Sequence, residues 1–163
     1  MIEIADWTSY FSAQAGAAAT LTGLVFVSVS INLSRIISIP GLSGRAAESI
    51  LQFFGVLIIS TTPLIPRQTG GALGAEILLI GSVLWIFQTA LLIVYARRRA
   101  GHPLYWLIVR VAQTQLATIP FCIAGILPLR GSSAGLYWLP VGVIFSLVSG
   151  VMNAWVLLVE ILR

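Results

Sequence analysis

The sequence predicts an all-α fold: a membrane bundle of about five transmembrane helices that forms a single domain over residues 1–163. Two observations predict it. Five stretches lack charged side chains, and each holds an apolar run near the ~20 residues that a helix needs to cross a ~30 Å hydrocarbon layer. A composition of 58% hydrophobic and 9% charged residues also leaves too little polar surface for a water-soluble globule. The uncharged stretches are 7–34, 49–66, 77–96, 111–129 and 131–159.

The first helix is expected over residues 15–34. Trp7, Tyr10 and Phe11 precede it, and such rings are typical of a segment at headgroup level. The acidic N-terminal residues lack the basic start of a secretory signal, so we expect this helix to stay in the mature protein.

Small residues recur every four positions along this first helix, a spacing that lets two helix backbones approach closely in lipid. We therefore expect it to pack centrally within the chain, with a subunit interface or a pore lining as the alternatives. The residues concerned are Ala15, Gly16, Ala19, Thr20 and Gly23.

The other four helices are expected over 46–66, 73–95, 104–129 and 136–159. Proline and glycine separate the helices, because neither residue readily continues one. These breaks fall at Pro40-Gly41, at Pro63 and Pro66 followed by Gly70-Gly71, and at His102-Pro103.

The arginines set the predicted orientation. All nine basic residues are arginines, placed mainly between apolar runs rather than on one face, which argues against a nucleic-acid partner. Short cytoplasmic loops carry excess positive charge, so we predict an N-out, C-in topology in which only Arg67 and Arg130 face out. The arginines then on or near the cytoplasmic side are Arg35, Arg45, Arg97, Arg98, Arg99 and Arg163.

Polar residues inside the predicted spans gather in the cytoplasmic half. Spacings of three and four residues place them on shared helix faces, which we expect to point inward as an intramembrane polar cluster. Its members are Asn32, Arg45, Glu48, Gln52, Gln88, Arg110, Gln113, Thr114 and Asn153.

Of these residues, Arg110 has the least favourable free energy of insertion into a membrane, because its charge lies about 10 Å into the fourth helix. Three interpretations remain open. The guanidinium can form a buried ion pair with Glu48, it can line an aqueous vestibule that attracts anions or regulates an ion path, or it can extend to the headgroups.

Two further features concern the fourth and fifth helices. Pro120 leaves the Leu116 carbonyl without its helical hydrogen bond, and we expect a kink there, with Thr118 or water as the substitute donor. Small polar residues on the fifth helix predict contacts between helices or a water-lined route; they are Ser146, Ser149, Gly150 and Asn153.

Enzyme signatures are mostly missing from the sequence. His102 and Cys122 are the only residues of their kinds, and Asp6 is the only aspartate. No cluster of these residues has metal-ligand spacing, and no serine has a nearby histidine. We therefore expect no catalysis, no metal and no cofactor.

One resemblance can be stated. The run from Ala17 to Val27, followed by Gly44 to Glu48, resembles the beginning of a widespread group of small bacterial membrane proteins of unknown function. The resemblance implies a multi-pass protein of the bacterial inner membrane, supplies no activity, and marks Arg45 and Glu48 as residues of interest.

Two functions fit these features. The first is an oligomeric ion channel or transporter-like pore, because short chains usually build a larger pathway as closed homo-oligomers. The second is a non-transporting scaffold or regulatory subunit that packs against another membrane complex. The expected partners are the lipid bilayer, further copies of the chain, and an ion or small solute.

Overall fold

The computed structural model describes residues 7–97 and 104–162. Within that part of the chain the secondary structure is entirely helical, which confirms the predicted fold class. The α-helices are α1 (Thr8–Ile31), α2 (Leu33–Ser38), α3 (Leu42–Thr61), α4 (Gly70–Arg97), α5 (Leu104–Leu129) and α6 (Trp138–Leu162), and the short 3-10 helices are η2 (Thr62–Leu64) and η3 (Ser133–Tyr137).

Five segments of the described chain are long and apolar enough to cross a membrane. The longest, α4, has 28 residues and is therefore about 42 Å long, which exceeds a hydrocarbon core of ~30 Å. Large apolar side chains cover the outer faces of these helices, as lipid contact requires. The segments are Thr8–Ile31, Leu42–Leu64, Gly70–Arg97, Leu104–Leu129 and Ala134–Glu160.

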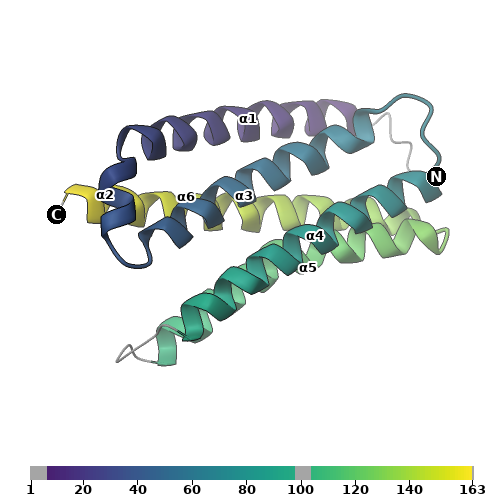
Figure 1. Ribbon diagram of the computed structural model, residues 1–163. Coiled ribbons are helices and arrows are strands. Elements are labelled where there is room, and N and C mark those ends of the chain that lie inside the picture. The colour runs from purple at the N-terminus through teal and green to yellow at the C-terminus, as the bar shows by residue number, and fades with distance from the viewer. Residues whose placement is uncertain (1–6, 98–103, 163) are drawn as a thin grey trace.

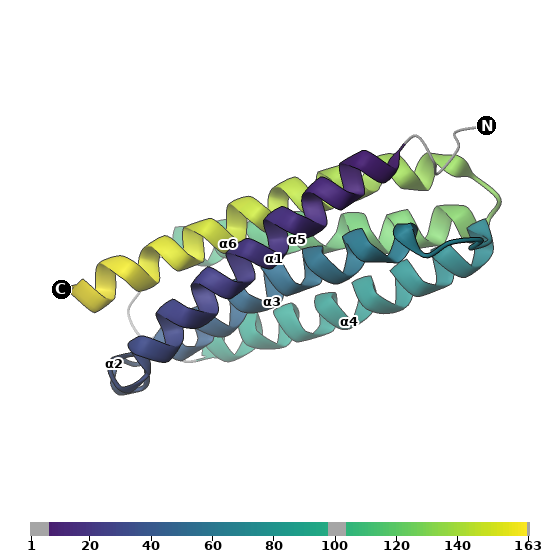
Figure 2. The same cartoon turned by 90° about the horizontal axis from the view of Figure 1, so that it is seen from above.

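The five long helices run alternately up and down, so the bundle has two ends (Figures 1 and 2). At the Arg45 end, α1, α4 and α6 finish while α3 and α5 begin; we call the opposite end the Pro63 end. α1 lies along α3, α3 also contacts α4 and α6, and α5 packs between α4 and α6. Figure 1 shows α4 and α5 diverging from α3 and α6 toward the Arg45 end.

The tightly packed part of the bundle lies toward the Pro63 end. Its core is apolar and includes Phe11, Ile59, Ile77, Phe121 and Leu139. Glycines bring the backbones together there: a Cβ on Gly125 of α5 would lie 2.5 Å from the Leu78 backbone nitrogen of α4. Such close approach supplies the dispersion contacts that hold helices together in lipid.

The first helix begins earlier than predicted. It starts at Thr8, so Tyr10 and Phe11 belong to the helix rather than to a headgroup segment before it. Phe11 is 1% exposed, and the Trp7 ring lies 5.9 Å from the Phe11 ring and 5.3 Å from the Tyr137 ring. These rings pack on one another because the starts of α1 and α6 meet at this end.

The small residues of α1 do not pack centrally within the chain, so that expectation is wrong. A Cβ added to Gly16 or Gly23 would have no atom within 4 Å, and Ala19 and Thr20 are exposed. Ala15 is half-buried. The helix instead turns a different face, with Phe11 and Ala18, toward the rest of the bundle. Spacing permits close approach but does not decide which face meets a neighbour.

Candidate functional site

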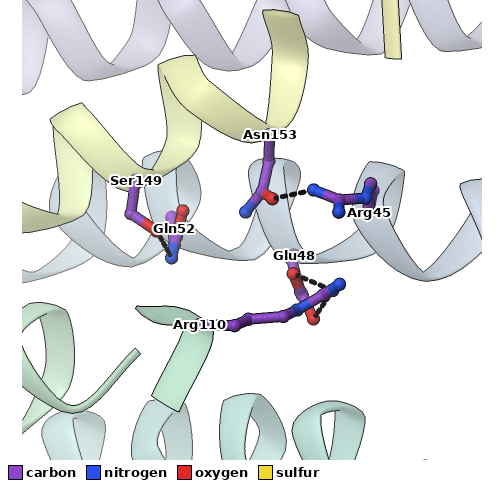
Figure 3. A network of polar contacts seen from close by, with 6 residues as sticks. All are labelled: Arg45, Glu48, Gln52, Arg110, Ser149 and Asn153. Carbon is purple, nitrogen blue, oxygen red and sulfur yellow. Dashed lines mark hydrogen bonds and ion pairs between the residues drawn. The ribbon is translucent and has the colours of Figure 1, made fainter. Parts of the chain in front are cut away.

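A buried ion pair joins α3 to α5 near the Arg45 end. The Arg110 Nη2 atom donates to both carboxylate oxygens of Glu48 at 2.6 Å, and Glu48 is only 4% exposed (Figure 3). The guanidinium carbon of Arg110 also lies 4.0 Å from the centroid of the Tyr95 ring on α4, a cation–π geometry. The expected pair therefore forms, and Arg110 is held inside the bundle rather than extended toward the headgroups.

Three buried hydrogen bonds connect α6 to α3 and α5. The Ser49 hydroxyl donates to the Gly150 carbonyl at 2.9 Å, and Gln52 Nε2 donates to Ser149 Oγ at 2.6 Å. The Ser146 hydroxyl donates to the Ala117 carbonyl of α5 at 2.9 Å. These residues are buried, so the polar stripe on α6 provides contacts between helices.

Arg45 is the second guanidinium at this site. It lies on α3 one turn before Glu48, is half-buried, and donates through Nη1 to Asn153 Oδ1 at a long 3.4 Å (Figure 3). The ion pairs of the described residues comprise Arg110 with Glu48 alone, so Arg45 makes no carboxylate contact among them. The site therefore holds two cations and one buried carboxylate, which pairs with Arg110.

A cavity of about 540 Å³ opens beside these arginines, and we call it the vestibule. Arg45, Arg110, Gln113 and Asn153 line its polar side. Glu160 also borders it, two helical turns beyond Asn153 and so about 10 Å farther toward the Arg45 end. Glu48 pairs with Arg110, so Arg45 gives the interior of the vestibule a net positive charge. The second carboxylate, Glu160, lies closer to the Arg45 end of the bundle.

The turn between α2 and α3 forms part of the vestibule wall. Pro40 cannot continue α2, and Gly41 has a positive φ of 86°, a backbone conformation that glycine adopts without a steric penalty. The turn starts α3 at Leu42 and so places Arg45 in the first turn of that helix.

Some hydrogen-bonding capacity of Arg110 is unused within the described structure. Its Nε and Nη1 atoms are buried and have no acceptor among the described residues. An unsatisfied buried donor destabilises a protein by about 1–3 kcal/mol. Because both nitrogens are enclosed, a further acceptor oxygen would reach them only after neighbouring side chains move.

The structure brings together six of the nine residues of the predicted cluster. These are Arg45, Glu48, Gln52, Arg110, Gln113 and Asn153. Gln88 is buried on α4 and Thr114 on α5, but neither lines the vestibule. Asn32 lies where α1 meets α2 and donates to the Ser28 carbonyl at 2.9 Å.

The vestibule also includes residues that the sequence did not place there. Tyr95 and Trp106 fit the aromatic belt of a membrane interface, and only the contact with Arg110 gives Tyr95 a role in the site. The available signal was an aromatic ring near the end of its span, on the same side of the membrane as Arg110. The predicted arginine turn at 97–99 lies outside the described residues beyond Arg97, as do His102 and Arg163.

One part of the prediction for Pro120 is wrong, namely that Thr118 is the substitute donor to the Leu116 carbonyl. α5 continues through Pro120 to Leu129 as one helix. The Thr118 hydroxyl donates to the Thr114 carbonyl at 2.9 Å and not to the carbonyl of Leu116. The reason is geometric: a threonine hydroxyl in a helix reaches the carbonyl four residues earlier.

The described residues include no group of three or more histidine, cysteine, aspartate or glutamate side chains that could hold a metal ion. Comparison with known proteins gives no match to a family model, a curated protein or a solved structure. Fold and site together define a class: a multi-pass helical membrane protein with a polar vestibule at one end.

Proposed function

We propose that the protein is a small membrane transport protein, a transporter-like pore that takes an anion into the vestibule. The observation that carries this proposal is Arg45, a half-buried guanidinium that borders the cavity without a carboxylate contact among the described residues. Charged side chains inside a membrane are unfavourable and are typical of substrate and ion pathways. The Arg110–Glu48 pair already connects α3 to α5. Arg45 is not needed for that contact and is available to bind an anion.

The geometry favours a transporter-like protein over an open channel. The vestibule reaches inward from the Arg45 end, and beyond it the apolar core around Phe121 and Leu139 fills the bundle. An anion in the vestibule can continue only if these helices move or if several chains form the path between them. Closed homo-oligomers are the common way to build such a path, and we propose one in the bacterial inner membrane.

The test is anion flux into liposomes that contain the purified protein. We expect chloride or phosphate flux that falls at least about tenfold in Arg45→Gln, because about 1.4 kcal/mol of lost anion stabilisation corresponds to that factor. Arg35→Gln is the matched control, since Arg35 is exposed on α2 at the same end of the bundle. Liposomes that are silent for both anions would contradict the proposal.

A second candidate is a non-transporting scaffold or regulatory subunit. The small-residue face of α1 favours it, because nothing in the described chain covers Gly16 or Gly23. Another membrane helix could approach this face closely. Co-purification of one stoichiometric partner, lost in Gly16→Leu together with silent liposomes, would favour this candidate over transport.

A further inference from the structure

The guanidinium groups of the vestibule lie near the depth of lipid phosphates. Arg45 is three residues into α3 and Arg110 six residues into α5, or about 5 and 9 Å along each axis. α5 is about 39 Å long and α3 about 30 Å, so these depths place Arg45 and Arg110 at or just inside the boundary between the hydrocarbon core and the headgroup layer, which is roughly 5–7 Å deep on each side. Phosphate is the anionic group that every phospholipid carries into this layer.

α5 and α6, which both line the vestibule, separate toward the Arg45 end (Figure 1). The close contacts between α5 and α6 lie toward the Pro63 end, where Gly142 meets the Phe121 ring and Ser146 bonds to Ala117. Toward the Arg45 end, Figure 1 shows the two helices diverging. The vestibule residues Trp106 of α5 and Met152 of α6 are exposed on this side.

The vestibule residues on this side, between α5 and α6, are apolar. Trp106 and Val109 of α5 and Met152 of α6 line the vestibule and are 59%, 38% and 53% exposed. A small inorganic anion makes no use of such walls, and a volume of about 540 Å³ is far larger than it needs. Polar groups on one side and apolar walls on the other fit a ligand with an anionic head and an apolar body.

The polar side supplies donors suited to a phosphate group. Guanidinium groups bind phosphate oxygens through charge-assisted hydrogen bonds. Arg45 makes one long hydrogen bond, to Asn153, while Arg110 has two buried nitrogens without an acceptor among the described residues. Glu160 stands nearer the mouth, and Glu48 is engaged by Arg110. Arg45 is therefore the guanidinium with donors available at the vestibule, and Arg110 adds positive charge beside it.

We propose that the vestibule binds the phosphate headgroup of an anionic phospholipid, which enters between α5 and α6. Arg45 donates to the phosphate and Arg110 adds positive charge beside it, while the glycerol and the upper acyl chains contact Val109 and Met152. Basic pockets between transmembrane helices are known to suit anionic headgroups. This inference rests on the proposed function, because it names the anion that the same vestibule takes.

The test is native mass spectrometry of the full-length protein in detergent with two lipids that share acyl chains. Phosphatidylglycerol is expected to bind at least about tenfold more tightly than phosphatidylcholine, a difference of about 1.4 kcal/mol, because both carry the phosphodiester but the choline cation of phosphatidylcholine is repelled by the arginines. Arg45→Gln should remove this preference, Arg45→Lys should keep part of it, and the control Arg35→Gln should keep all of it. Thermal unfolding shows whether each variant is folded, and phosphatidylglycerol should raise the midpoint of the wild type but not of Arg45→Gln.

Two outcomes would overturn the inference. One is that the wild type binds both lipids equally well, or that a folded Arg45→Gln variant keeps the lipid selectivity of the wild type. The other is binding of inorganic phosphate, tested alone, as tightly as phosphatidylglycerol, which would assign the site to a soluble anion. Selective lipid binding without flux would contradict the proposed transport and support this inference, whereas flux without selective lipid binding would do the reverse.

Discussion

At the scale of single residues, the Arg110–Glu48 pair is the main electrostatic feature of the bundle. Taking both ions out of water is unfavourable, and their attraction offsets this only when the geometry is good. Contact of one nitrogen with both carboxylate oxygens at 2.6 Å and the Tyr95 ring favour the pair, whereas two buried guanidinium nitrogens without an acceptor among the described residues oppose it. We therefore expect the largest loss of stability when only one partner of the pair is removed.

We predict that Glu48→Gln destabilises the protein by about 3 kcal/mol, because the substitution leaves Arg110 buried without its counter-charge. Arg110→Gln should have a similar effect by leaving Glu48 unpaired. The double variant should lose clearly less than the sum of the two single losses. Unfolding in mixed detergent with increasing SDS measures the three differences.

A strictly additive double variant would show that the two charges are not coupled. Gln115→Ala is a suitable control, since Gln115 bonds to Trp85 at the exposed side of α4 and α5. We expect that variant to remain within about 0.5 kcal/mol of the wild type, as is usual for exposed sites.

At the scale of helices, glycine content alone does not show where two helices meet. Gly125 on α5 lies against the Leu78 backbone, whereas Gly16 on α1 has open space around its missing side chain. Both glycines lie in apolar helices of the same chain. Only the contact with backbone atoms, which cannot move aside as a flexible side chain does, makes a glycine indispensable.

We predict that Gly125→Ala destabilises the protein by about 1–3 kcal/mol through overpacking against α4. Gly16→Ala is the matched control: it should be neutral or stabilising by up to about 1 kcal/mol, because alanine favours a helix over glycine. The SDS unfolding midpoints of the two variants measure the difference. Equal midpoints would contradict the close packing of α4 on α5.

At the scale of the whole molecule, the arginines are unequally divided between the two ends. Arg35, Arg45, Arg97 and Arg110 belong to the Arg45 end, and Arg67 and Arg130 to the Pro63 end. Because cytoplasmic loops carry the excess of arginine, the Arg45 end should face the cytoplasm. The vestibule would then open to the cell interior and to the inner leaflet.

We predict that a membrane-impermeant maleimide labels Arg130→Cys but not Ser38→Cys in intact spheroplasts, in a Cys122→Ala background. Both positions are exposed and lie at opposite ends of the bundle. After the membranes are opened, both should be labelled to a similar extent. The opposite pattern in intact spheroplasts would reverse the N-out, C-in topology and place the vestibule outside.

Much of the candidate site could be predicted from the sequence. A charge buried in a membrane needs a partner, and Glu48 was the available carboxylate at the depth of Arg110, so the pair followed from composition and topology. The side chains of Gln88 and Thr114 are polar and lie at a similar depth, yet they do not line the vestibule. Depth follows from position along a helix, but which neighbour a side chain meets depends on how each helix is rotated in the bundle.

The sequence by itself determined the number of long helices, their alternating direction and the end at which polar residues gather, because the length and spacing of apolar runs decide these properties. The tertiary structure alone decided the outward position of the α1 glycines, the divergence of α5 from α6 and the vestibule between them. The physical reason is that lipid and protein interior are both apolar. Hydropathy therefore shows that a residue avoids water, but not whether lipid or another helix surrounds it.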